Sequence, residues 1–178
     1  MVMERFGDLR LYDRVGTLGG GLTHDELLAL EFATVTAPYE EVREFVLREA
    51  RVRPGFHELV ERHDPLVISG TFHELIEPVL EREGVSVELL ANRVEPRSEG
   101  WRVVLRDGAT CDSCGEGCKR AALPPGKVVY VGDGYSDRCA ALVAGQVFAR
   151  DGLATYLDEL GVPYTPFEDL RDVVRGLG

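Results

Sequence analysis

The sequence predicts an α/β protein whose parallel sheet is covered by helices on both faces. From residue 51 onward, short apolar runs such as PLVIS and KVVYV alternate with segments of helical periodicity. Strands of a parallel sheet that is buried on both faces read as such continuous apolar runs. Hydrophobic residues make up 44% of the 178 residues, which is enough for a packed core in one domain of ordinary size.

Residues 1–50 read as helical and show no strand pattern. In THDELLALEFATV, Thr23 is followed three residues later by Glu26, which is the spacing of a capping box at the start of a helix. The segment APYEEVREFVLREA places its apolar residues at helical spacing. A glycine-rich break, GTLGGGLT, interrupts this part of the chain.

Residues 51–178 predict the alternation of strands and helices in detail. A Pro-Gly turn at the start is followed by predicted helices over 56–63, 73–84, 136–145, 153–161 and 166–178. Predicted strands lie over 64–72, 85–95, 127–134 and 146–152, and the alternating segment 99–108 reads as a hairpin arm.

Composition narrows the class of function. The formal net charge of −11 argues against nucleic acid or a membrane surface as a partner, because both are polyanionic. No apolar stretch approaches the roughly 20 residues of a membrane span, and the N-terminus MVMERFGDLR lacks the apolar region of a signal peptide. We therefore expect a cytoplasmic protein whose partner is a small molecule.

Small polar and charged residues follow two of the predicted strands. The strand PLVIS is expected to end at Ser69, Gly70 and Thr71, and KVVYV at Gly132-Asp133-Gly134, with Asp137 a turn later. Ligands of open parallel sheets bind at such carboxyl ends. A hydroxyl, backbone N–H groups and the Lys119 ammonium suit a phosphate, and a carboxylate suits Mg²⁺. Together they predict a phosphoryl-transfer site.

The order of Ser69 in VISGT, a lone Lys119 and GDGYSD resembles motifs II, III and IV of the haloacid dehalogenase superfamily of phosphatases. The branch in question holds phosphoserine phosphatase and 2-hydroxy-3-keto-5-methylthiopentenyl-1-phosphate phosphatase, and the resemblance covers residues 51–174. It implies a three-layer Rossmann-like core over 51–178, with residues 1–50 as a small helical cap. It also implies Mg²⁺-dependent hydrolysis of a small phosphate monoester through an aspartyl-phosphate, with the methionine-salvage enol phosphate as the first substrate and phosphoserine as the second.

The same resemblance assigns roles to single residues. Ser69 and the Gly70 N–H would bind the phosphoryl oxygens, and Lys119 would neutralise their charge, with Lys127 as a weaker rival. Asp133 would bind Mg²⁺, and Asp137 would support that metal site.

The nucleophile motif of this family, DxDGT at the end of the central strand, is missing from the sequence. The nearest string, YDRVGTL, would make Asp13 the nucleophile, but its strand is poorly apolar. We expect instead that the strand and its motif lie upstream of Met1, and that the chain as written is inactive. The Ser69 and Asp133 strands would then flank a gap with open edges. The alternative is a catalytically silent relative that binds a phosphorylated ligand or a protein partner. A homo-oligomer is compatible with either hypothesis.

The cysteines leave three interpretations open. Cys111, Cys114 and Cys118 form a Cys-x2-Cys-x3-Cys loop, and Cys139 is the fourth thiol. Cys-x2-Cys is half of a structural zinc site, but a disulfide or plain thiols near the site fit the same spacing.

Overall fold

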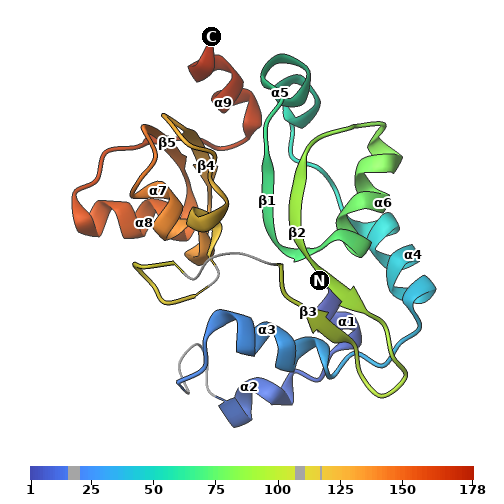
Figure 1. Ribbon diagram of the computed structural model, residues 1–178. Coiled ribbons are helices and arrows are strands. Elements are labelled where there is room, and N and C mark those ends of the chain that lie inside the picture. The colour runs from blue at the N-terminus through green and yellow to red at the C-terminus, as the bar shows by residue number, and fades with distance from the viewer. Residues whose placement is uncertain (16–20, 107–110, 117) are drawn as a thin grey trace. The chain divides into compact units, whose positions relative to one another are not determined.

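The computed structural model describes residues 1–15, 21–106, 111–116 and 118–178 (Figure 1). These residues form two compact units, and each is described here by itself. The first unit comprises Met1–Ala50, Ser69–Ser86 and Leu90–Asp107. The second comprises Arg51–Ile68, Val87–Leu89 and Gly108–Gly178. The boundary between the two units therefore falls between Ile68 and Ser69 and between Leu89 and Leu90, in both cases within a strand.

The N-terminal part of the first unit is helical, as the periodicity predicted. Thr23 and Glu26 form a complete capping box, in which the Thr23 side chain accepts a hydrogen bond from the Glu26 N–H. In the described residues, no helix is long and apolar enough to cross a membrane. The helices of this unit are α1 (Val2–Phe6), α2 (Arg10–Val15), α3 (His24–Phe32), α4 (Tyr39–Glu49) and α6 (His73–Glu83).

Helices α3, α4 and α6 pack on a hydrophobic core that includes strand residues. The Phe32 and Phe72 rings meet edge to face with centroids 4.6 Å apart, and Trp101 donates a hydrogen bond of 2.9 Å to the Ala37 carbonyl. Trp101 and Phe72 are among the largest fully buried side chains of the described residues. The strands are hydrogen-bonded in the order β1 (Val67–Phe72), β2 (Leu89–Glu95) and β3 (Arg102–Val104), with β2 and β3 antiparallel.

Strand β1 ends at Phe72, where the strand predicted over 64–72 ends, but it begins only at Val67. Ser69 and Gly70 therefore lie within the strand and not in a turn that follows it. Helix α6 begins at the next residue, His73, and its N-cap is Phe72, with no side-chain cap. Ser69 therefore does not cap that helix.

The second unit contains the parallel sheet that the sequence predicted. Val129–Gly132 (β4) pairs in parallel with Gln146–Ala149 (β5), and β5 pairs in parallel with Thr165–Pro166 (β6), a short strand that the sequence did not reveal. The predicted helix over 136–145 is a 3-10 turn, η2 (Tyr135–Asp137), followed by the short α7 (Arg138–Ala141). The other helices are α5 (Phe56–His63), η1 (Lys119–Ala122), α8 (Asp151–Leu160) and α9 (Leu170–Leu177).

Alternate residues of β5 show that helices cover both faces of this sheet. Val147 and Ala149 belong to a core cluster with Leu153 and Leu157 of α8, whereas Phe148 belongs to a second cluster with residues of α5 and α9. Successive side chains of a strand point to opposite faces. The second unit is therefore layered helix, sheet, helix, with α7 and α8 on one face (Figure 1).

Candidate functional site

The carboxylate of Asp137 is the centre of the polar network at the carboxyl end of β4. Its Oδ1 accepts hydrogen bonds from Lys119 Nζ at 2.6 Å and from the Tyr130 hydroxyl at 2.7 Å. Its Oδ2 accepts from the backbone N–H groups of Asp133 at 3.0 Å and Gly134 at 2.9 Å. Asp137 is 2% exposed and is the buried charged residue of the described core. A buried carboxylate with this many donors is ionised and fixed in orientation.

Gly132 explains why the strand KVVYV ends in a glycine. A Cβ built on Gly132 would lie 2.7 Å from Cγ of Asp137 and 2.9 Å from its Cβ and Oδ2. Only a residue without a side chain lets the Asp137 carboxylate come this close to the end of β4. The sequence Gly-Asp-Gly thus leaves room for the Asp137 carboxylate and also places Asp133 at the end of β4.

The network shifts the pKa of both acids in it. Burial raises the pKa of Asp137, but the charge of Lys119 and the hydrogen bonds from Lys119, Tyr130 and Gly134 outweigh burial, so that its pKa lies below the ordinary value. Burial, together with the adjacent Asp137 carboxylate, raises the pKa of Tyr130. At neutral pH the group consists of an ammonium, a carboxylate and a neutral phenol.

Lys119, and not its rival Lys127, lies at this network. Lys119 is the first residue of η1, and its side chain is only 19% exposed. Lys127 is exposed and precedes β4. An ammonium that is pinned on one side by Asp137 and keeps its other N–H groups available is suited to bind phosphoryl oxygens.

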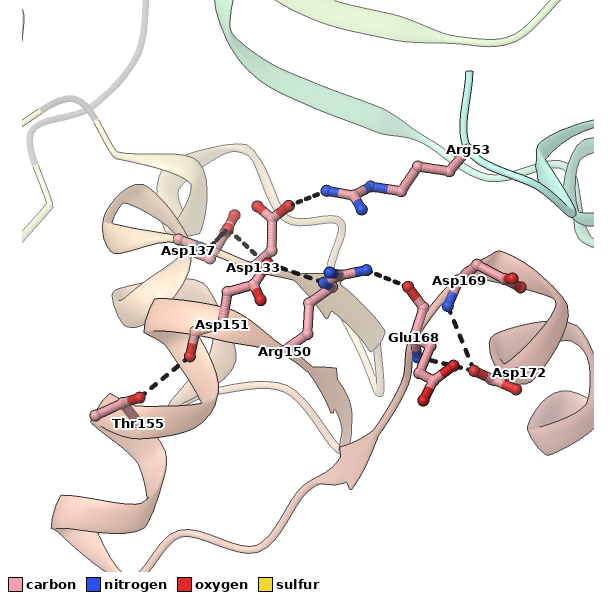
Figure 2. A network of polar contacts seen from close by, with 10 residues as sticks. Arg53, Asp133, Asp137, Arg150, Asp151, Thr155, Glu168, Asp169 and Asp172 are labelled. Atoms are coloured by element: carbon pink, nitrogen blue, oxygen red, sulfur yellow. Dashed lines mark hydrogen bonds and ion pairs between the residues drawn. The ribbon is translucent and has the colours of Figure 1, made fainter. Parts of the chain in front are cut away.

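Asp133 lies at the end of β4 with its carboxylate turned toward solvent. Its Oδ2 accepts a hydrogen bond of 2.7 Å from Arg53 Nη2 (Figure 2). The two side chains are 46% and 45% exposed, so this ion pair is held loosely. The backbone of Asp133 is anchored more firmly, because its carbonyl accepts the N–H of Leu153 in α8 at 3.2 Å.

Arg53 is held in reach of Asp133 by the turn that follows it. The Pro54 carbonyl accepts the N–H of Leu170, at the start of α9, at 3.0 Å. Gly55 has a φ of 87°, and a Cβ there would lie 2.4 Å from the Arg171 nitrogen. Glycine is therefore required both by the backbone conformation and by the close approach of α9.

The described residues do not form a complete magnesium site by themselves. Mg²⁺ takes oxygen ligands in an octahedron and is commonly held by one or two carboxylates together with substrate phosphate. Asp133 offers such a carboxylate, but Asp137 is occupied by its donors. In the part of the chain that the structure describes, no group of three His, Cys, Asp or Glu ligands gathers around Asp133. Further oxygen ligands would have to come from another segment and from the substrate.

Ser69 and Gly70 belong to the first unit. The Ser69 hydroxyl accepts a hydrogen bond of 3.1 Å from the Thr71 N–H, and the Gly70 carbonyl accepts one of 3.0 Å from the Asn92 side chain. A Cβ on Gly70 would lie 3.7 Å from Nε2 of His24. The phosphate-binding role of Ser69 and Gly70 stays a prediction.

A cavity of about 510 Å³ lies beside β4 within the second unit. One wall is the first half of β1, with Val67 and Ile68, and another is β4, with Val129 and Val131. Each of these strands is the outermost of its hydrogen-bonded sheet in the described residues. Lys119 and Tyr130 line the same cavity, which is otherwise mostly apolar.

Comparison with known proteins identifies a family that matches most of the chain. The haloacid dehalogenase-like hydrolase family matches residues 4–142. The chain belongs to this family. A 2-hydroxy-3-keto-5-methylthiopentenyl-1-phosphate phosphatase of Geobacillus kaustophilus is 32% identical over 151 residues, which cover 77% of this chain and 68% of that protein. The enzyme of the same description from Brevibacillus brevis is 28% identical over 151 residues, covering 76% and 67%.

A solved structure supports the fold of this haloacid dehalogenase-like hydrolase. The crystal structure of phosphoserine phosphatase from T. onnurineus in complex with NDSB-201 matches with a TM-score of 0.63 at 21% identity. The match covers 93% of this chain and 78% of that one. The chain is thus a haloacid dehalogenase-like hydrolase with the mixed α/β fold of phosphoserine phosphatase, and its curated relatives are phosphatases.

Two participants in the site were missed by reasoning from the sequence. Arg53 lies 80 residues from Asp133 along the chain, and only the Pro-Gly turn after it hinted at a fixed position. Tyr130 reads as an ordinary strand residue, although a buried tyrosine needs a partner for its hydroxyl. Asp13, the less favoured candidate nucleophile, is exposed on helix α2 and does not follow a strand.

Proposed function

We propose that this chain is the phosphate-binding part of a Mg²⁺-dependent phosphomonoesterase that acts on a small phosphorylated metabolite. The observation that carries the proposal is the ion pair of 2.6 Å between Lys119 and the buried Asp137, at the carboxyl end of a parallel strand. Keeping an ammonium largely out of water is costly unless negative charge compensates it. The negative charge of a transferring phosphoryl group can supply such compensation, and the ammonium in turn stabilises that group.

In this proposal the chemical step uses a nucleophile from another segment. An aspartate on that segment attacks phosphorus, the alcohol or enol oxygen leaves with a proton, and water then hydrolyses the aspartyl-phosphate to release inorganic phosphate. Lys119 balances the negative charge on the phosphoryl oxygens in both steps, and Asp137 holds Lys119 in place. Mg²⁺, when bound at Asp133, would add further charge neutralisation.

The cavity between β1 and β4 is where we propose that the nucleophile strand lies. It has mostly apolar walls, it is bordered by Val67, Ile68 and the outermost strand β4, and Lys119 lines it. A strand entering there would pair its backbone groups with the open edge of β4 and would bring the residues after it toward Lys119. We propose that the segment encoded upstream of Met1 is this strand, and that it ends in DxDGT.

The substrate proposal follows the relatives. The curated proteins that match this chain at about 30% identity act on an enol phosphate by their names. We therefore propose the methionine-salvage enol phosphate as first substrate and phosphoserine as second. The discriminating measurement is the ratio of kcat/KM for the two esters.

A second candidate function is a catalytically silent protein that binds a phosphorylated ligand or a protein partner. The observation that favours it is the pairing of Arg53 with Asp133, which places a guanidinium where a metal ion would otherwise approach. In a silent relative, Arg53 and Lys119 would bind phosphate without turnover.

The test begins with the DNA upstream of Met1, read in the same frame. An apolar strand followed by DxDGT is the expected result, and the chain extended by it should hydrolyse p-nitrophenyl phosphate with Mg²⁺. Changing the first aspartate of that motif to asparagine should abolish turnover, as should Lys119→Met, whereas exposed Lys127→Met should not. An in-frame stop or an unrelated sequence would reject the enzyme hypothesis and leave the silent relative. Phosphate binding to the 178-residue chain, lost in Lys119→Met, would then support that alternative.

A further inference from the structure

The four cysteines of the chain come together in the second unit. Cys111, Cys114 and Cys118 lie in the loop before η1, and Cys139 lies on α7. Their sulfur atoms all lie within 4.8 Å of one another, and all four are free thiols. In a tetrahedral zinc site with Zn–S bonds of about 2.3 Å, the sulfurs are about 3.8 Å apart. The observed cluster needs to contract by no more than about 1 Å to meet that geometry.

The backbone around the loop is already turned as a metal-binding turn requires. The Cys111 carbonyl accepts the Gly115 N–H at 2.8 Å, and the Cys111 N–H donates to the Glu116 carbonyl at 2.8 Å. Gly115 has a φ of 74°, which favours glycine directly after Cys114.

The loop has little else to hold it in this shape. The sequence CDSCGEGC contains no large apolar side chain, so burial of a core cannot fix the loop. Cys111 is 4% exposed although its neighbours in the loop are polar. In small motifs, a structural metal ion can hold a polar loop folded and bring thiols from separate segments together. Here four thiols from two segments meet in such a loop.

We propose that Cys111, Cys114, Cys118 and Cys139 bind one structural Zn²⁺ ion. Four thiolates leave no open position for substrate or water, so the ion is structural. Zinc suits a tetrahedral set of four sulfurs and undergoes no redox change. Binding displaces the protons of the thiols and adds no covalent step. The ion takes no direct part in the phosphatase chemistry, and its binding stands whether or not the proposed function holds.

The positions of the four cysteines along the chain indicate the structural role of the ion. Cys118 directly precedes Lys119, and Cys139 follows Asp137 by two residues. The ion therefore ties together the two chain segments that carry the ion pair between Lys119 and Asp137. We infer that zinc acts as a positioning element for that pair, by holding η1 against α7.

Metal analysis of the purified protein is the first test. We expect one zinc per chain in protein prepared without chelator, and Co²⁺ added to the metal-free protein should give thiolate-to-cobalt charge transfer and the intense visible bands of tetrahedral coordination. Protein with no stoichiometric metal and no such cobalt spectrum would overturn the proposal. Iron as the only bound metal would overturn the assignment to zinc. A disulfide in freshly isolated protein, seen as a loss of two hydrogens in the intact mass, would also overturn it.

Variants test the ligand set. Cys139→Ser, which changes the ligand outside the loop, should lower zinc affinity by at least tenfold, as should Cys111→Ser, whereas Asp112→Asn in the same loop should leave it unchanged. Zinc affinity unaltered by Cys139→Ser would contradict the four-ligand site. Because a variant can fail to fold, the cobalt spectrum of the wild-type chain remains the independent measurement.

Discussion

The interaction between Lys119 and Asp137 gives the sharpest test of how this site is built. Asp137 is 2% exposed and the Lys119 side chain is 19% exposed, so solvent screens the pair far less than a surface ion pair. Removing one partner of a buried pair typically costs about 3–5 kcal/mol, because the other charge is left without compensation. The site is at the lower end of this range, since Lys119 keeps some solvent contact. We therefore expect Asp137→Asn and Lys119→Met each to lower the free energy of unfolding by about 3 kcal/mol.

A double-mutant cycle isolates the interaction from these separate losses. The variant with both changes should be less destabilised than the sum of the two single variants by about 2 kcal/mol. The matched control is the exposed pair between Arg62 and Glu58 in the same unit, with N–O distance 3.1 Å and side chains 43% and 52% exposed. Its coupling energy should be about 0.3–0.5 kcal/mol.

The assay is urea unfolding at neutral pH, in saturating zinc, followed by far-ultraviolet circular dichroism. Helical ellipticity is the better probe because the one tryptophan, Trp101, belongs to the first unit and does not report directly on the second. A coupling energy for Lys119 and Asp137 no larger than that of the control pair would refute the view that this pair is a buried, fixed element of the site.

Three further outcomes follow from the same geometry. Gly132→Ala should lower the free energy of unfolding by about 1–3 kcal/mol, because its Cβ would lie 2.7 Å from Asp137 Cγ. Gly134→Ala should cost clearly less, because its Cβ would lie 3.9 Å from Asp137 Oδ2. Urea unfolding measures both, and equal losses would contradict the steric argument. Since the pKa of Asp137 is lowered on folding, its stabilising contribution is complete above its ordinary pKa of 3.8 and is lost as pH falls below that value. Unfolding measured from pH 6 to pH 2 should therefore show a larger loss of stability in the wild-type chain than in Asp137→Asn. Arg53→Ala should change stability by less than about 1 kcal/mol, because its pair with Asp133 is nearly half exposed, and a larger loss in thermal unfolding would show that Arg53 has a structural role.

The candidate site was partly predictable because its residues follow strand ends. Asp133 lies two residues, and Asp137 six residues, after the apolar run VVYV, and ligands of parallel sheets bind at that end. Lys119 could be assigned only from its order along the chain in the resembling family. The structure adds the contact that gives Lys119 its position, an ion pair with a residue 18 positions away.

The rest depends on tertiary contacts that leave little trace in local sequence. Arg53 meets Asp133 because α9 docks on the turn at Pro54 and Gly55, and no pattern in the residues around Arg53 indicates that docking. Cys139 joins the cysteine loop because α7 packs on η1, a contact between separate segments. Strand β1 continues through Gly70 because β2 pairs beside it and Asn92 of β2 bonds the Gly70 carbonyl, which outweighs the weak strand propensity of Ser and Gly.

The most direct test of the proposed function is phosphate release by the 178-residue chain itself, with Mg²⁺ and p-nitrophenyl phosphate. If the nucleophile comes from another segment, as proposed, the chain should release phosphate no faster than buffer does. Sustained release that disappears in Asp133→Ala would mean that these residues already contain a nucleophile, and the proposal of a strand supplied from elsewhere would then be wrong.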